Sequence, residues 1–142
     1  MTSLQSPTLV SMHRLRYRVL GAKYAICRLA PDAPIPEWAR LPGEFVSITW
    51  TSEELSIVCP QEIVPGDVQA ASGWVCLQLA GPFPVTQTGI LTSFVGPLSA
   101  REIPIFVVAT FDTDYVLIPE SRWSTALEIL RAAGHEFMSD GD

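Results

Sequence analysis

The sequence predicts an α+β fold made of two similar halves, in which antiparallel strands form sheets that carry helices on one face. Three observations support this. Short runs rich in β-branched and aromatic residues alternate with Pro and Gly, two stretches show helical apolar spacing, and two strand blocks repeat at one constant offset. The chain has 142 residues, of which 48% are apolar and 17% charged, a composition typical of one compact, core-rich unit.

Seven runs have the length and residue types of strands, and each is bounded by turn-forming residues. They are Leu15–Leu20, Tyr24–Leu29, Glu44–Trp50, Leu55–Cys59, Trp74–Leu79, Ile105–Phe111 and Tyr115–Ile118. The polar lead over residues 1–12 and the acidic tail over residues 139–142 show no such pattern, so we expect both to be loosely ordered.

Apolar residues recur at helical spacing in two stretches. In the first, which follows Thr86 or Thr88 as the N-cap, they are Ile90, Leu91, Phe94, Val95 and Leu98. Pro97 is expected to kink or end this helix because it lacks an amide hydrogen. In the second, which begins near Ser121 and is stopped by Gly134, they are Trp123, Ala126, Leu127, Leu130 and Ala133. A short strand over residues 135–138 completes the pattern.

An offset of 60 residues superposes two strand blocks without a gap, which indicates an internal duplication. The aligned blocks are residues 15–21 with 75–81 and residues 45–58 with 105–118. In this alignment Ser52 and Glu54 of the first turn correspond to Asp112 and Asp114 of the second. Any two amphipathic hairpins match at some offset, but two blocks that share one offset favour duplication over chance.

The second copy, residues 73–138, has the order β-α-β-β-α-β. This is the split βαβ or ferredoxin-like unit, whose four-stranded antiparallel sheet packs both helices on one face. The first copy, residues 13–72, is degenerate, because the Pro-rich segments PDAPIPEWARLPG and PQEIVPGDVQAAS stand in place of its helices. We therefore expect two tandem ferredoxin-like modules that meet near residue 72.

Charge and composition exclude several classes of partner. Nine basic and fifteen acidic residues give a net charge of −6, which would repel nucleic acid and anionic lipid surfaces. No run approaches the ~18 to 20 apolar residues that span a bilayer, and the N-terminus lacks a basic region followed by an apolar one. We expect a cytoplasmic protein with neither nucleic acid nor a membrane as its partner.

Cysteine and motif patterns argue against metal sites and catalysis. Cys27, Cys59 and Cys76 lie in apolar runs without C-x-x-C spacing, so we interpret them as buried apolar side chains rather than a disulfide or zinc site. The sequence contains no G-x-S-x-G, H-E-x-x-H, Walker A or G-x-G-x-x-G motif. A nucleophile pair such as Cys59 with His135 is disfavoured because a catalytic thiol needs partial exposure. We expect no enzymatic activity, no cofactor and no metal.

Four runs carry a likeness to a known family: YAICRLAPDAPIPEWA, FVSITWTSEELSIVCP, TGILTSFVGPL and IFVVATFDTDYVLIPE, the last followed by an Ala/Leu-rich helix ending in RAAGH. Together they resemble the small bacterial double-ACT-domain proteins related to the CASTOR arginine sensors, from about Tyr17 to Gly134. The resemblance implies two ACT modules side by side, an amino acid bound at their contact, and no catalysis. CASTOR sensors are roughly twice this length, so the resemblance also implies that the chain pairs with itself as a homodimer.

An amino-acid zwitterion needs donors for its carboxylate and an anion for its ammonium group, and the second copy offers both. Free N–H groups and the helix dipole favour an anion at a helix start, where the candidates are Thr88, Gly89, Ile90 and Leu91. The acidic turn supplies the candidates Thr110, Phe111, Asp112, Thr113 and Asp114. Asp114 is preferred for the ammonium group because it shares a strand face with Val116 and Ile118, whereas Asp112 belongs to the turn.

These residues also have structural interpretations. Asp112 and Thr113 suit a hairpin turn, Thr88 a plain helix cap and Gly89 a turn or packing position. The first-copy turn is either solvated or a second site, and its acidic residues are Glu53 and Glu54. Large apolar anchors suit a core or a dimer interface, and they are Trp38, Trp50, Trp74 and Trp123. The role of Arg28, inside an apolar strand, stays open.

Two functions are compatible with this pattern. The first is a non-catalytic regulatory or sensor protein, a homodimer that binds a small amino acid between modules and changes its pairing when occupied. The sequence does not specify which amino acid. The alternative is a structural dimerisation or protein-interaction domain without a small-molecule ligand.

Overall fold

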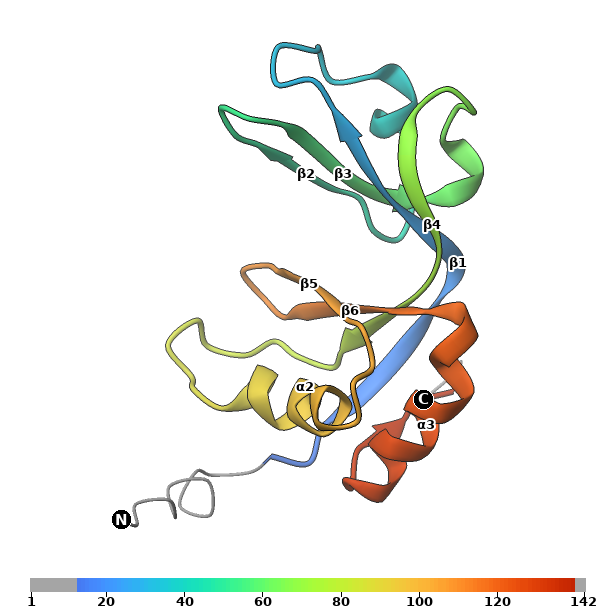
Figure 1. The fold of residues 1–142 in the computed structure, drawn as a ribbon. Coiled ribbons are helices and arrows are strands. Elements are labelled where there is room, and N and C mark those ends of the chain that lie inside the picture. Colours follow the sequence, from blue (N-terminus) through green and yellow to red (C-terminus); the bar gives the residue numbers. More distant parts are fainter. Residues whose placement is uncertain (1–12, 140–142) are drawn as a thin grey trace, which may run out of the picture.

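A computed structural model describes residues 13–139, which form one seven-stranded sheet and two α-helices (Figure 1). The strands are β1 (Arg16–Leu29), β2 (Ser47–Trp50), β3 (Leu55–Pro60), β4 (Gln69–Leu79), β5 (Phe106–Ala109), β6 (Asp114–Pro119) and β7 (Glu136–Phe137). The helices are α2 (Ile90–Ala100) and α3 (Trp123–Ala132), with short 3₁₀ turns η2 (Glu37–Arg40), η3 (Gln61–Ile63) and η4 (Glu120–Arg122). The expected α+β class is confirmed. The expected lead over residues 1–12 and most of the tail lie outside the described residues.

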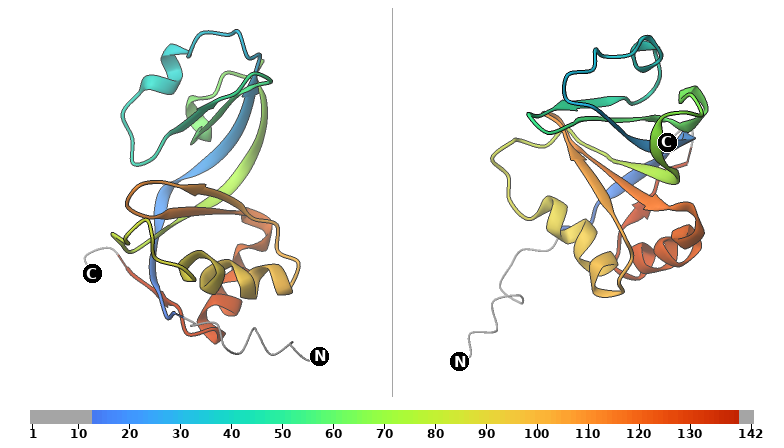
Figure 2. Two further views of the ribbon diagram at one scale, coloured as in Figure 1. Left: turned by 90° about the vertical axis from the view of Figure 1, so that its left-hand side faces the viewer. Right: turned by 45° about the horizontal axis from the view of Figure 1, so that its top comes forward.

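The sheet has the order β2-β3-β1-β4-β6-β5, and β7 pairs with β1. Figures 1 and 2 show that the β2–β3 and β5–β6 hairpins extend to the same side of the long β1–β4 pair. Both helices pack on one face of the part of the sheet that contains β5 and β6. Their buried side chains, among them Phe94, Leu98 and Leu130, share one core cluster with Tyr17 and Leu77 of the sheet. A separate cluster around Ala25, Cys27, Leu55 and Cys59 supports the other half.

β1 differs from the sequence-based expectation in two ways. The two strands expected at Leu15–Leu20 and Tyr24–Leu29 form one strand, because the backbone continues through Gly21, whose N–H donates to Glu44 Oε1 at 3.0 Å. The start of β1 also lies between β4 and β7, pairing with β4 in antiparallel and with β7 in parallel orientation. Residues 73–138 therefore do not form the expected four-stranded antiparallel sheet by themselves. The expected module boundary near residue 72 stays a prediction.

The internal repeat is present, but its spacing in the second block is 59 residues rather than the expected 60. β2 and β5 begin at residues 47 and 106, β3 and β6 at 55 and 114, and η3 and η4 at 61 and 120. Pro60 and Pro119 precede the two 3₁₀ turns with nearly identical backbone angles. One residue matters here, because successive strand residues point to opposite faces of a sheet. The residue equivalent to Asp114 is therefore Leu55, not Glu54.

Helix α2 begins and continues differently from the expectation. Its N-cap is Gly89, whose φ of 83° is left-handed, and no side chain caps the helix, so neither Thr86 nor Thr88 acts as the cap. Pro97 lies inside the helix and does not end it. Because Pro97 has no amide hydrogen, the carbonyl oxygen of Ser93 lacks its usual helical donor. His135 Nε2 lies 2.9 Å from that oxygen and replaces the missing donor.

The three cysteines are buried and free, as their apolar surroundings indicate. Within residues 13–139, no three or more His, Cys, Asp or Glu side chains gather in a way that could hold a metal ion. No helix in this part of the chain has the length and hydropathy needed to cross a bilayer.

Candidate functional site

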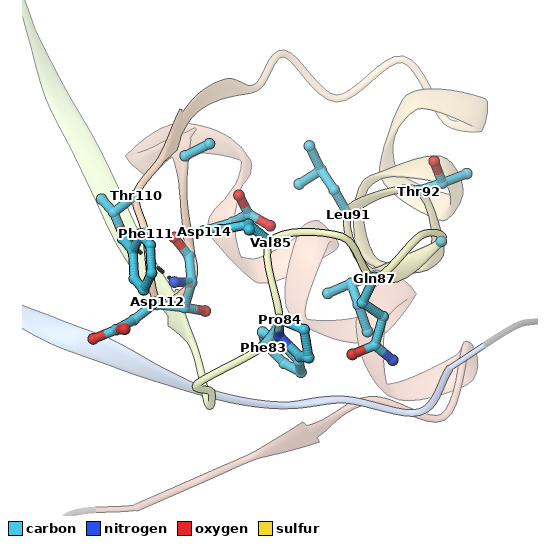
Figure 3. Close-up of a pocket in the computed structure, with 14 residues that line it drawn as sticks. Phe83, Pro84, Val85, Gln87, Leu91, Thr92, Thr110, Phe111, Asp112 and Asp114 are labelled. Carbon is cyan, nitrogen blue, oxygen red and sulfur yellow. Dashed lines mark hydrogen bonds between the residues drawn. The ribbon is translucent and has the colours of Figure 1, made fainter.

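A cavity of about 370 Å³ lies between the β5–β6 turn, the loop over residues 83–88 and the first turn of α2 (Figure 3). It brings together eight of the nine candidate residues: Gly89, Ile90, Leu91, Thr110, Phe111, Asp112, Thr113 and Asp114. Thr88, the ninth, is not among the lining residues. The helix start and the acidic turn, which supply these candidates, therefore enclose one cavity.

The β5–β6 turn is held by two threonines. Thr110 donates to the carbonyl of Thr113 from both its N–H (2.9 Å) and its Oγ1 (2.7 Å). The Thr113 hydroxyl donates to the carbonyl of Leu79 at 2.8 Å, and Thr113 is only 7% exposed. The structural interpretation of Thr113 is thus confirmed, and Thr110 shares this role. Because both hydroxyls are engaged, they stabilise the cavity wall rather than offer free donors.

The loop over residues 83–88 is attached directly to this turn. The N–H of Phe83 donates to the carbonyl of Asp112 at 2.8 Å. Gly81 permits this approach, because a Cβ atom at that position would lie 2.9 Å from the same Asp112 oxygen. The backbone of Asp112 is therefore structural, while its carboxylate points away from α2 (Figure 3).

The start of α2 offers backbone donors to the cavity. The first bond of the helix runs from the Ser93 N–H to the carbonyl of Gly89 at 3.0 Å. The N–H groups of residues 90–92 precede it and receive no side-chain cap from Gly89. The first turn also contains no acidic residue. An uncapped helix start of this kind attracts an anion through its N–H groups and the helix dipole.

Asp114 provides the opposite charge. Figure 3 shows its carboxylate between the hairpin turn and Leu91 at the start of α2. Desolvation by burial raises the pKa of this carboxyl group above its ordinary value. Among the described residues no cation pairs with it. A bound ammonium group would therefore compensate a charge that the fold leaves without a partner.

Six further lining residues were not identified from the sequence: Phe83, Pro84, Val85, Gln87, Thr92 and Ala109. The loop residues carry no chemical motif, and only their attachment to the turn brings them to the cavity. Phe111 and Val85 are 81% and 68% exposed, which leaves two large apolar side chains in water at the cavity. Among the described lining residues the charged side chains are Asp112 and Asp114, and none is basic.

The corresponding turn of the first half has the same backbone pattern. Thr51 donates its N–H to the carbonyl of Glu54 at 3.0 Å, and its Oγ1 accepts the N–H groups of Glu53 and Glu54 at 3.1 Å. Arg28, whose role the sequence left open, donates to the carbonyl of Glu53 at 2.9 Å. The Glu53 side chain is exposed and the Glu54 side chain is half-buried. This agrees with a solvated turn rather than with a copy of the Asp114 position.

Comparisons with known proteins identify the family. The ACT domain family model matches residues 69–132, and a separate model of an N-terminal domain matches residues 22–67. The mouse cytosolic arginine sensor for mTORC1 subunit 1 is 29% identical over 104 residues, which are 68% of this chain and 31% of that protein. The chain thus spans less than a third of the length of the curated relatives it matches.

Solved structures extend the likeness over nearly the whole chain. Protein Atu0741 from Agobacterium tumefaciens is 41% identical with a TM-score of 0.84, covering 92% of this chain and 96% of that one. Aspartate kinase from Clostridium acetobutylicum shares the fold alone, at 12% identity and a TM-score of 0.60, over 87% of this chain and 36% of the kinase. The family models, the sensor relatives and this fold agree, and the chain belongs to the ACT-domain proteins related to the CASTOR arginine sensors.

Proposed function

We propose that this chain is a non-catalytic regulatory protein that binds a free amino acid in the cavity between the β5–β6 turn and α2. One observation carries the proposal. The unpaired carboxylate of Asp114 and the uncapped start of α2 line the same 370 Å³ cavity. A free amino acid is a small molecule that carries both complementary charges.

The ligand would be held at both ends of its zwitterion. Its carboxylate would accept hydrogen bonds from the N–H groups of residues 90–92, where the helix dipole is positive. Its ammonium group would donate to Asp114, and these charge-assisted bonds would offset the desolvation of that carboxylate. Gly89 lets the backbone approach the ligand closely, because this residue carries no side chain.

The charge of the lining predicts which amino acids bind. Asp112 and Asp114 repel a second carboxylate, and no basic side chain of the described lining offsets them. Aspartate and glutamate should therefore be poor ligands, while neutral and basic amino acids are accepted. The mouse relative is named an arginine sensor, so arginine is the first ligand to test.

The ligand site is proposed to lie at a contact between ACT modules of two chains. All lining residues come from the segment 83–114, so a second wall would be supplied by another copy. Phe111 and Val85, exposed at the cavity, offer apolar surface for that contact. A ligand that binds one arrangement of the homodimer more tightly would shift its population, which is how such a protein would transmit a signal. A cytoplasmic location stays a prediction.

Calorimetric titration with each of the twenty amino acids tests the proposal. At least one neutral or basic amino acid should bind, and Asp114→Asn should weaken it about tenfold or more, the effect of losing a charge-assisted hydrogen bond. The matched control is Asp112→Asn, which should bind nearly as well as the wild type because that carboxylate points away from α2. Absence of binding to the folded wild type, or equal losses in the two variants, would contradict the proposal.

The alternative function is a structural dimerisation domain. Several large apolar side chains are exposed on the described surface, and they are Ile35, Leu41, Ile48, Trp50, Val85, Phe111 and Phe137. Light scattering that shows a stable dimer, together with no calorimetric response to any amino acid, would favour this alternative.

A further inference from the structure

The first half of the molecule has a second cavity at the place that corresponds to the first. This cavity, about 240 Å³, lies where the loop before η2 meets the β2–β3 hairpin. It is lined by Ala33, Pro34, Ile35, Arg40, Trp50 and Leu55. Both cavities thus lie between a hairpin and the segment that leads into the next helical element.

The 59-residue repeat shows how the two cavities differ. Trp50 stands where the second half has Ala109, and Leu55 stands where it has Asp114. The Trp50 indole is fixed across the site because its Nε1–H donates to the carbonyl of Pro31 at 2.7 Å. Leu55 is only 2% exposed and closes the floor. The carboxylate that would recognise an ammonium group is therefore absent.

The first half also has no counterpart of the α2 helix start. In place of α2 the first half has the four-residue turn η2, which follows Pro36 and carries Glu37 in its first turn. A 3₁₀ turn of this length aligns few peptide dipoles, so its start is a weak site for the carboxylate of a zwitterion. The cavity is thus unsuited to the zwitterion proposed for the other site.

Arg40 gives this cavity a different chemistry. It is the one charged residue among the described residues that line the cavity. No described carboxylate pairs with it. The backbone before it is anchored because Ala39 is buried in the same cluster as Leu55. A planar guanidinium beside an indole and aliphatic side chains favours an anion that carries a flat apolar body.

We propose that this cavity binds a small aromatic monocarboxylate, with its ring against Trp50, Leu55 and Ile35 and its carboxylate on the Arg40 guanidinium. A single ring with a one-carbon arm matches a cavity of 240 Å³. Asp32, which lies with Trp50 along a neighbouring depression, would repel a second carboxylate. The inference does not depend on the proposed amino-acid site.

Nuclear magnetic resonance titration of the ¹⁵N-labelled full chain with phenylacetate tests this site. The Trp50 indole N–H signal, assigned by its loss in Trp50→Phe, should shift together with the amides of residues 33–35 and 40. Phenylacetamide, the neutral isostere, should bind about tenfold more weakly because the charge-assisted bond to Arg40 is lost. Phenethylamine, a cation of similar shape, should cause no shift.

Two variants separate this site from the other one. Arg40→Gln should reduce phenylacetate affinity about tenfold, and its exposed position predicts an otherwise unchanged spectrum. Asp114→Asn should leave phenylacetate binding unchanged. The proposal would be overturned by equal binding of phenylacetamide, by unchanged affinity in Arg40→Gln, by shifts that map to residues 83–92 and 110–114 instead, or by no shift at millimolar phenylacetate.

Discussion

The β2–β3 and β5–β6 hairpins have the same backbone and different chemistry. Thr51 and Thr110 begin both turns with the same hydrogen-bond pattern, and Pro60 and Pro119 end the second strand of each hairpin in the same conformation. One hairpin nevertheless carries a buried Leu55 where the other carries Asp114. This difference indicates that a few turn and strand-end residues preserve the backbone of both hairpins. Single residues that line each cavity then determine which ligand each half accepts.

The two halves also differ in how their walls are supported. The second half has an eleven-residue helix, whose start faces the cavity, whereas the first has a four-residue 3₁₀ turn. The longer helix packs Phe94 and Leu98 into the core and can leave its first N–H groups unpaired. The shorter turn η2 provides no α-helix start, and the cavity beside it is lined mainly by apolar side chains.

Exchanging the cavity residues Leu55 and Asp114 should have the largest effect on stability. Leu55→Asp would place a carboxylate at a site that is 2% exposed and should lower the free energy of unfolding by about 4 kcal/mol. The reciprocal Asp114→Leu removes a desolvated charge and should change stability by less than about 1 kcal/mol, while it abolishes amino-acid binding. Urea unfolding followed by circular dichroism measures both. Equal destabilisation by the two exchanges would contradict the different environments inferred for the two positions.

Loss of His135, which replaces the donor that Pro97 lacks, should have the next largest effect on stability. His135→Leu leaves both the Ser93 carbonyl and the Leu15 N–H, which donates to His135 Nδ1 at 3.1 Å, without partners. We expect a loss of about 3 kcal/mol in urea unfolding. In the Pro97→Ala background the loss should be smaller, because the new amide of residue 97 donates to Ser93. A double-mutant cycle measures this coupling, and additive losses would contradict it.

The same histidine gives a pH dependence that checks this interpretation. Burial lowers the pKa of His135 from 6.5, so the folded state binds this proton less readily than the unfolded state. Its contribution to stability is complete above about pH 6.5 and is lost as the pH falls through the lower folded-state pKa. The difference in unfolding free energy between wild type and His135→Leu should therefore shrink from pH 7.5 to pH 5. A constant difference would exclude the titration.

A smaller effect on stability is expected at Gly81, where the loop over residues 83–88 is attached to the β5–β6 turn. Gly81→Ala places a Cβ atom 2.9 Å from the Asp112 carbonyl oxygen and should cost about 1–2 kcal/mol, with weaker amino-acid binding. Gly43→Ala, before the β2–β3 hairpin, meets no atom within 4 Å and is the matched control. Thermal unfolding should shift in the first variant alone. A similar shift in both would point to chain entropy rather than to close approach.

The smallest effect on stability should come from the two positions that shape the cavities most. Trp50→Ala removes a side chain that is 75% exposed, and Ala109→Trp adds one at an exposed site, so each should change stability by less than about 1 kcal/mol. Ala109→Trp should nevertheless block amino-acid binding by filling its cavity. Calorimetry and thermal unfolding on the same samples separate these outcomes. Full binding by a folded Ala109→Trp protein would place the ligand elsewhere.

Local patterns were sufficient for most elements and for the site's two segments. Helical spacing predicted α3, residue types predicted β3, and the β-α-β-β-α-β order predicted the final short strand. The acidic turn and the start of α2 are local motifs in the sequence, and the structure places both at one cavity. The repeat spacing was off by one residue because β3 and β6 contain consecutive buried apolar residues, at 57–59 and 116–118, which align about equally well at a spacing of 59 or 60. The shared prolines at residues 60 and 119 are the signal that gives the correct spacing.

Other features depend on contacts between distant residues. The position of β1 between β4 and β7 requires pairing of residues 16 and 17 with residues 136 and 137, which no local pattern encodes. Pro97 was expected to kink or end α2, and it does not end the helix because a histidine 38 positions later replaces the lost donor. The role of Thr113 was anticipated from turn chemistry, whereas the loop residues that complete the cavity were not.

The path of β1 limits how this molecule can be divided. Its first residues belong to the core beneath both helices, and its last residues belong to the core of the other half. A fragment that starts at residue 69, where the ACT match begins, would lack the strand that separates β4 from β7 and would expose the side of each. The β2–β3 hairpin pairs with β1 and the β5–β6 hairpin pairs with β4, so the long β1–β4 pair carries the connection between the two halves of the sheet.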